Sequence, residues 1–397
     1  MSAYAQLNLI KHRLAVLHTR DAEADQMIER GHRLKAEVAV EIEAAKSELA
    51  SAVAAPLECD EDPTGWLPNE LMIMVLSHVV FLGDCRSVCK RWHALCRDHQ
   101  LKTAVGLSRW RAYADGRRTP QTVTGHTSWV FALAVGKDGK VYSGSLDKTV
   151  KVWCGSTGAL LQTLQGHTHC VRALAIGHDG SVFSGSYDST VKVWSGHDGA
   201  LVRTLVGLGL TVWSLAVDSL HLYSGSYDDT IRVWLCSTGQ CVHTLQAHSG
   251  TVFALALDHR GKLYSGSDDN TIRVWSTSEH THIQTLTGHG SDVEALAVGK
   301  DGTLFSGSWD KTIKVWSGTD GSVLRTLHGH SYGVTSLAVA PDGLLLSGCD
   351  SEMRVWCREQ GWKSRVFAHG GTNVLALAVG TGGQMYSNSE NEVLFWR

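Results

Sequence analysis

SGSWDKTIKVW, residues 306–316, predicts two short strands joined by a tight turn. Gly307 and the small serines on either side of it suit a strand that packs closely against a neighbour. Asp310 favours a turn, because its side chain can form hydrogen bonds with its own backbone. Residues 312–316 are β-branched and aromatic with Lys314 on the opposite face, an alternation that is typical of a second strand.

The same hairpin occurs seven times at an almost constant spacing. Each copy closes on a tryptophan, and these are Trp153, Trp194, Trp234, Trp275, Trp316, Trp356 and Trp396. Successive tryptophans lie 41, 40, 41, 41, 40 and 40 residues apart. A fixed period near forty residues indicates an array of structural repeats, so the repeat is the unit of the fold.

Each repeat predicts four short strands. In the fifth repeat, a strand ends in Gly288-His289 and the apolar strand 293–298 follows. A turn at residues 300–302 then leads into the hairpin quoted above. A Gly-His pair and a closing Trp in a four-stranded unit resemble the WD repeat, which builds the blades of β-propellers. The resemblance implies a mostly β fold with a seven-bladed propeller over residues 119–397.

The last repeat ends one strand short of a complete blade. Residues 121–124 form an extra strand ahead of the first repeat. We expect this strand to pair into the last blade and close the ring, because closure removes an exposed sheet edge.

Residues 1–55 predict a long helix, because they are rich in Ala, Glu, Lys, Leu and Arg and contain no proline. Apolar residues recur every three or four positions, beginning with Leu7, Ile10 and Leu14, which is the pattern of a narrow apolar seam. The helix either forms a coiled coil that makes the chain a homo-oligomer or docks on another surface. The acidic segment 59–63 follows as a linker.

Residues 64–104 predict a small helical module, and Pro68 suits the first turn of its first helix. The segments Leu67-Pro68-Asn69-Glu70-Leu71 and Val88-Cys89-Lys90-Arg91-Trp92 resemble an F-box. Their position ahead of WD-like repeats strengthens the resemblance. Residues 105–118 read as a linker between this module and the repeats.

An F-box implies binding to a Skp-type adaptor, which joins a cullin ubiquitin ligase. The residues that would form or support the adaptor surface are Leu67, Pro68, Leu71, Ile73, Leu76, Val88 and Trp92. The alternative is that these residues form only the core of a helical spacer.

Four residue types recur in order within the repeats and resemble the structural tetrad of WD proteins. The four complete sets are His126/Ser143/Asp147/Trp153, His167/Ser184/Asp188/Trp194, His248/Ser265/Asp269/Trp275 and His289/Ser306/Asp310/Trp316. Ser, His and Asp also suit catalysis, but an active site is normally single, whereas this set is repeated. The resemblance implies a hydrogen-bonded strut in each blade.

Three repeats depart from the tetrad pattern. Leu208 replaces the histidine of the third, Glu390 replaces the aspartate of the seventh, and one residue is deleted before Asp350 and before Glu390. We expect these blades to be less rigid.

The variable positions inside this constant frame carry the specificity. Similarity to WD propellers places two positions of each repeat at the ligand-binding rim of the propeller's top face. One is the residue after the first Val of the inner strand, and the other is the residue before the turn aspartate. The predicted substrate-binding residues are Trp129, Phe131, Arg172, Tyr187, Trp213, Tyr227, Phe253, Asp268, Glu294 and Trp309. Aromatic rings beside carboxylates suit a peptide with an Arg or Lys side chain or an apolar anchor. The alternative is that some of these aromatic residues pack between blades.

The composition narrows the classes of partner. The formal net charge is −3, which gives no sign of a basic nucleic-acid surface. No apolar run approaches the roughly 18 residues needed to span a membrane, and His12, Arg13 and Arg20 interrupt any signal-peptide core. We therefore expect a cytoplasmic or nuclear protein with neither nucleic acid nor membrane as a partner.

Ten cysteines are present, without the paired spacing of a zinc ribbon or of a disulfide framework. Cys85, Cys89 and Cys96 with His93 would suit zinc, but their spacing also describes one buried face of a helix. We favour the buried face, and we expect reduced thiols, no cofactor and no metal.

Together these features predict a substrate-recognition subunit of a Skp–cullin–F-box ubiquitin ligase that catalyses no reaction itself. The alternative is a WD scaffold or peptide reader that has no role in ubiquitin transfer and is oligomerised by residues 1–55.

Overall fold

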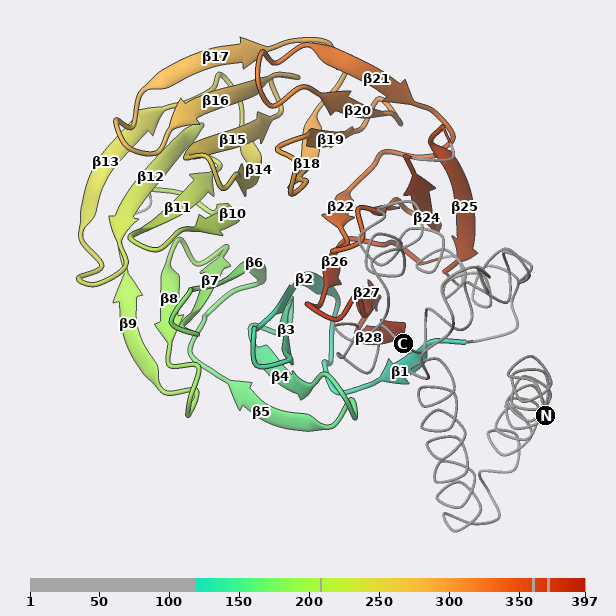
Figure 1. Ribbon diagram of the computed structural model, residues 1–397. Coiled ribbons are helices and arrows are strands. Elements are labelled where there is room, and N and C mark those ends of the chain that lie inside the picture. Colours follow the sequence, from blue (N-terminus) through green and yellow to red (C-terminus); the bar gives the residue numbers. More distant parts are fainter. Residues whose placement is uncertain (1–118, 208, 359–360, 370–371, 397) are drawn as a thin grey trace, which may run out of the picture. The chain divides into compact units, whose positions relative to one another are not determined.

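The computed structural model describes residues 119–207, 209–358, 361–369 and 372–396. All regular secondary structure in these residues is β-strand, arranged in seven four-stranded sheets. Figure 1 shows the sheets side by side around a ring, in the order of the chain. The predicted seven-bladed propeller is therefore confirmed. The helical segments predicted within residues 1–118 lie outside the described residues.

The first four blades each take four consecutive strands. Blade 1 comprises β2 (Val130–Val135), β3 (Lys140–Ser145), β4 (Val150–Cys154) and β5 (Leu160–Leu164). Blade 2 comprises β6 (Val171–Ile176), β7 (Val182–Ser186), β8 (Val191–Trp194) and β9 (Leu201–Leu205). Blade 3 comprises β10 (Val212–Val217), β11 (His221–Ser226), β12 (Thr230–Leu235) and β13 (Cys241–Gln246). Blade 4 comprises β14 (Val252–Leu257), β15 (Lys262–Ser267), β16 (Ile272–Ser276) and β17 (His282–Leu286).

The remaining blades follow the same plan, except that the last takes its outer strand from the start of the array. Blade 5 comprises β18 (Val293–Val298), β19 (Leu304–Ser308), β20 (Ile313–Trp316) and β21 (Val323–Leu327). Blade 6 comprises β22 (Ser336–Val339), β23 (Leu345–Gly348), β24 (Glu352–Cys357) and β25 (Lys363–Ala368). Blade 7 comprises β26 (Leu377–Val379), β27 (Met385–Ser389), β28 (Glu392–Trp396) and β1 (Gln121–Val123).

Strand β1 closes the ring as the sequence predicted. It pairs antiparallel with β28, with Thr122 opposite Leu394. Val123 is 7% exposed and belongs to a core cluster that includes Trp153 and Phe395. The first and last parts of the array therefore share one sheet and one core.

The hydrophobic core lies between adjacent blades. One cluster joins Tyr142 of blade 1 to Val182 and Trp194 of blade 2, and similar clusters fill the other junctions. The Ser-Gly-Ser segments lie where the sheets approach most closely. A Cβ atom at Gly307 would lie 2.6 Å from Cγ1 of Val334 in the next blade, so a larger side chain does not fit there. Among the described residues, no helix has the length and apolarity of a membrane span.

Candidate functional site

The four complete tetrads form continuous hydrogen-bond chains. In blade 1, Trp153 Nε1 donates to Ser143 Oγ at 2.7 Å, and Ser143 Oγ lies 2.7 Å from His126 Nε2. His126 Nδ1 lies 2.7 Å from Asp147 Oδ2. With the Nδ1–H tautomer, every donor in this chain meets an acceptor. Blades 2, 4 and 5 repeat it, with His Nδ1 to Asp Oδ2 distances of 2.7, 2.8 and 2.7 Å.

The tetrads stabilise the blades and are closed to substrates. Ser143, Ser184, Ser265 and Ser306 have no exposed surface, so no substrate can reach their hydroxyl groups. Burial opposes ionisation of Asp147, but hydrogen bonds from His126 and Thr149 outweigh it and hold the pKa of Asp147 well below its usual range. The carboxylate stays charged and ties two loops together, which is a structural role.

Blades 3 and 7 replace the missing tetrad members in different ways. In blade 3, Asp228 Oδ2 accepts a hydrogen bond from Arg232 Nη1 at 2.8 Å, and Leu208 lies outside the described residues. In blade 7, His369 Nδ1 lies 3.2 Å from Thr372 Oγ1, so a hydroxyl takes the position of the carboxylate. Glu390 is exposed and takes no part in the strut.

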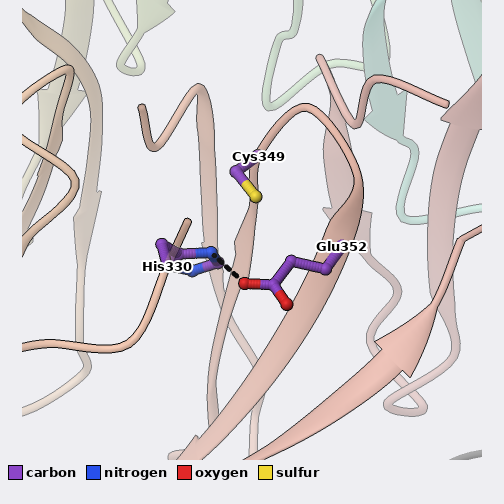
Figure 2. Close-up of side chains that lie close together, drawn as sticks. All are labelled: His330, Cys349 and Glu352. Atoms are coloured by element: carbon purple, nitrogen blue, oxygen red, sulfur yellow. Dashed lines mark ion pairs between the residues drawn. The ribbon is translucent and has the colours of Figure 1, made fainter. Parts of the chain in front are cut away.

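Blade 6 brings three metal-ligand types together, which the sequence did not predict. The acid that faces His330 is Glu352, which lies two residues beyond Asp350 in the shortened turn. Cys349, in the same turn, is fully buried. Of the residues that the structure describes, His330, Cys349 and Glu352 form the one group of three such side chains whose ligand atoms all lie within 4.8 Å of one another (Figure 2).

The predicted rim residues form a linked aromatic cluster on blades 1 to 4. Arg172 follows the first residue of β6, and its guanidinium stacks 4.9 Å from the ring centroids of both Phe131 and Trp213. Trp213 in turn packs against Tyr187 at 5.3 Å and Phe253 at 5.1 Å between centroids. The second positions of four adjacent inner strands therefore contact one another, and the protein's own arginine fills part of the aromatic site.

Two hydrogen-bond donors in this cluster have no partner. Arg172 Nε and Trp213 Nε1 are both buried and make no hydrogen bond to the described residues. Burying an amide-type donor without an acceptor costs about 1–3 kcal/mol.

The opposite side of the rim is acidic. Trp309 Nε1 donates to Glu294 Oε1 at 2.7 Å, and Trp309 remains 48% exposed. Burial raises the pKa of Glu294, although the hydrogen bond from Trp309 and the charge of Arg172 lower it. Burial and the neighbouring carboxylate of Asp292 also raise the pKa of Asp268. These carboxylates repel one another, so a cation would be favoured beside them.

The predicted rim residues differ in exposure. Trp129, Tyr227 and Trp309 are exposed, whereas Phe131 and Phe253 are half-buried. The half-buried rings pack across blade boundaries and still reach the surface, so the packing alternative holds for them in part, and substrate contact stays a prediction. The seven residues predicted to contact an adaptor lie outside the described residues.

The fold and these features define a WD-type β-propeller, a class of protein-binding platform. The family model described as WD domain, G-beta repeat matches residues 117–154, 158–195, 199–234, 239–276, 280–317 and 321–357. A model described as F-box-like matches residues 66–107. The chain belongs to the WD-repeat family, with an F-box-like domain ahead of the repeats.

Comparison with solved structures gives the same fold. The crystal structure of the WD40 beta propeller domain of Doa1 matches with a TM-score of 0.64 and 27% sequence identity. The match covers 70% of this chain and 95% of that chain. None of the curated proteins matches this chain.

Proposed function

We propose that this protein is the substrate-recognition subunit of a Skp–cullin–F-box ubiquitin ligase. An F-box-like domain at residues 66–107 precedes a propeller with a partly exposed aromatic rim, and this combination carries the proposal. The F-box would bind a Skp-type adaptor in a cullin complex. The propeller would hold a substrate close to the conjugating enzyme, so its contribution to the reaction is proximity.

The rim favours a peptide with mixed chemistry. Its acidic side, at Asp268 and Glu294, suits an Arg or Lys side chain of the substrate, and Trp309 offers an exposed ring for a cation–π contact. The guanidinium of Arg172 already occupies the space between the rings of Phe131 and Trp213. On that side the cluster would have to open before a substrate could supply an acceptor, such as a backbone carbonyl, for the two unpartnered donors, because both atoms are buried.

Binding of purified adaptor tests the proposal. We expect a Skp-type adaptor to bind the full chain and to be lost from the Leu67→Ala/Pro68→Ala variant. The Pro56→Ala/Leu57→Ala variant alters a Pro-Leu pair outside the F-box match and should bind normally. Equal binding by all three proteins, or no binding by the wild type, would refute the ligase role.

The alternative function is a WD scaffold or peptide reader without a role in ubiquitin transfer. The 3–4 apolar spacing within residues 1–55 favours it, because a coiled coil would give such a reader several propellers. Absence of adaptor binding together with an oligomer that depends on residues 1–55 would support this alternative.

A further inference from the structure

Blade 6 departs from the other blades at two neighbouring positions. Counting from the glycine of the Ser-Gly-Ser segment, Cys349 occupies the position of Ser308 in blade 5. Counting back from the closing tryptophan, Glu352 occupies the position of Thr312. One residue is also missing from the turn between them. Asp350 keeps the place of Asp310 when counted back from the closing tryptophan, but the acid that faces His330 is Glu352, so the blade gains a thiol and a carboxylate beside its histidine.

The pairing of histidine with its acid also differs. In the four complete tetrads, His Nδ1 lies 2.7 to 2.8 Å from the aspartate oxygen, which is hydrogen-bond distance. In blade 6, His330 Nδ1 lies 3.3 Å from Glu352 Oε1. This nitrogen is buried and has no partner in hydrogen-bond geometry among the described residues. The hydrogen bond between histidine and acid is therefore missing in blade 6, and the thiol of Cys349 lies near the unpartnered nitrogen.

A spacing of 3.3 Å matches two ligands of one zinc ion. Zinc bonds to histidine nitrogen and carboxylate oxygen are about 2.0–2.2 Å long, and tetrahedral geometry then separates the two ligand atoms by roughly 3.3 Å. Figure 2 shows the sulfur of Cys349 close to the His330 ring and to the Glu352 carboxylate. Histidine, thiolate and carboxylate are a donor set that zinc prefers.

The surrounding residues orient these ligands. His330 Nε2 lies 2.6 Å from Ser347 Oγ, which also accepts a hydrogen bond from Trp356 Nε1 at 2.8 Å. Ser347 can accept a second hydrogen bond from His330 Nε2–H, which leaves Nδ1 free for a metal. Arg354 holds Glu352 through Nε to Oε1 at 2.9 Å and Nη2 to Oε2 at 3.3 Å. Partners of this kind around metal ligands fix their orientation.

We propose that His330 Nδ1, Cys349 Sγ and Glu352 bind a structural zinc ion, with water as the fourth ligand. The ion ties the loop before β22 to the shortened turn between β23 and β24. It thereby takes over the role of the His–Asp hydrogen bond that this blade lacks. Binding requires the thiol to lose its proton to solvent, so the site carries zinc and a thiolate together.

The zinc content of the purified full chain tests this proposal. We expect about one zinc ion per chain after dialysis, and loss of that ion in Cys349→Ser, which restores the serine of the other blades. Cys89→Ser is the matched control, because Cys85, Cys89, Cys96 and His93 offer another zinc donor set. It should retain the ion. Glu352→Thr, the second reversion to the repeat pattern, should bind zinc more weakly.

Cobalt provides a readout that is specific for the thiolate. Cobalt-loaded wild type should show a sulfur-to-cobalt charge-transfer band in the near ultraviolet, and Cys349→Ser should lack it. A chelator should lower the melting temperature of the wild type and leave that of folded Cys349→Ser unchanged. Wild type that takes up no zinc even from added zinc, or zinc that is lost from Cys89→Ser and kept by Cys349→Ser, would overturn the proposal.

Discussion

Each tetrad serine holds two buried groups at once. Ser184 Oγ lies 2.8 Å from His167 Nε2 and accepts a hydrogen bond from Trp194 Nε1 at 2.8 Å. All three residues are buried, so water cannot replace the hydroxyl group. Loss of this one oxygen would leave His167 Nε2 and Trp194 Nε1 without a partner, while His167 Nδ1 keeps Asp188.

We therefore predict that Ser184→Ala lowers the free energy of unfolding by roughly 2–4 kcal/mol, because each unsatisfied buried group costs about 1–3 kcal/mol. Denaturant unfolding of the full chain measures this change. Thr168→Ala is the control, since that side chain is exposed, and its effect should stay within about 0.5 kcal/mol. Equal stability of the two variants would show that the strut contributes nothing.

His280 lies at the junction of blades 3 and 4, where the residues in contact differ from those at the other junctions between blades. It adopts φ +54°, whereas Gly199 and Gly321 occupy the same turn position in other blades. A Cβ atom at Gly199 would lie 2.3 Å from Gln162 Nε2, so the glutamine would have to move, and the φ of +70° also favours glycine there. At the junction of blades 3 and 4, His243 replaces the glutamine and packs 4.4 Å from the His280 ring centroid. Two histidine rings are therefore in contact at the position equivalent to the one where Gln162 and Gly199 meet, at the junction of blades 1 and 2.

Stability at this junction should depend on pH. Burial lowers the pKa of His280, the rings of His243 and His221 lower it further, and Asp218 raises it. The folded state therefore binds fewer protons than the unfolded state, whose histidines titrate near pH 6.5. This stability is complete above the unfolded-state pKa and is lost below it, as the pH falls through the lower pKa that His280 has in the folded state.

We predict that the melting temperature of the wild type falls more between about pH 7.5 and about pH 5.5 than that of His243→Gln/His280→Gly, a range that brackets the histidine pKa. This variant restores the Gln-Gly pairing of Gln162 with Gly199 and of Gln284 with Gly321, and it also removes a strained backbone conformation. Parallel pH profiles for the two proteins would be evidence against titration at this junction.

At the scale of elements, the repeat period predicted the strands, their order and the closure by β1. These features depend on alternating apolar residues, on turn aspartates and on glycines at close approaches, all of which are visible in the sequence. The position of Glu352 was not predicted, because a one-residue deletion changes which side chain reaches His330. Stacking of Arg172 between Phe131 and Trp213 was also missed, because it joins three blades and has no local sequence signal.

Closure by β1 makes the stability of the whole ring depend on one short strand. We predict that Val123→Asp lowers the melting temperature strongly and exposes the chain near β1 to protease, because it places an unpaired carboxylate in the core. Thr124→Asp, at the adjacent exposed position, should behave like the wild type. Unchanged melting and proteolysis of Val123→Asp would show that β1 does not hold blade 7.

At the scale of the whole molecule, the rim has a single arginine among its ten predicted residues, and its guanidinium is stacked between two rings. Recognition of phosphate usually requires bidentate arginine contacts. We therefore predict that phosphatase treatment of substrate proteins leaves their capture by the full chain unchanged. Quantitative pull-down before and after treatment measures this, and loss of capture after treatment would require a phosphorylated ligand.

The rim is proposed to bind substrate and the F-box to bind the adaptor, so the two activities should be separable. Quantitative affinity purification of the wild type, Phe253→Ala/Trp309→Ala and Leu67→Ala/Pro68→Ala tests this directly. Leu161→Ala/Leu324→Ala, at exposed positions of the outer strands β5 and β21, is the control for the rim variant.

We expect the rim variant to lose substrate proteins and keep the adaptor and cullin, and the F-box variant to do the reverse. The same set of partners on all four proteins would contradict the account.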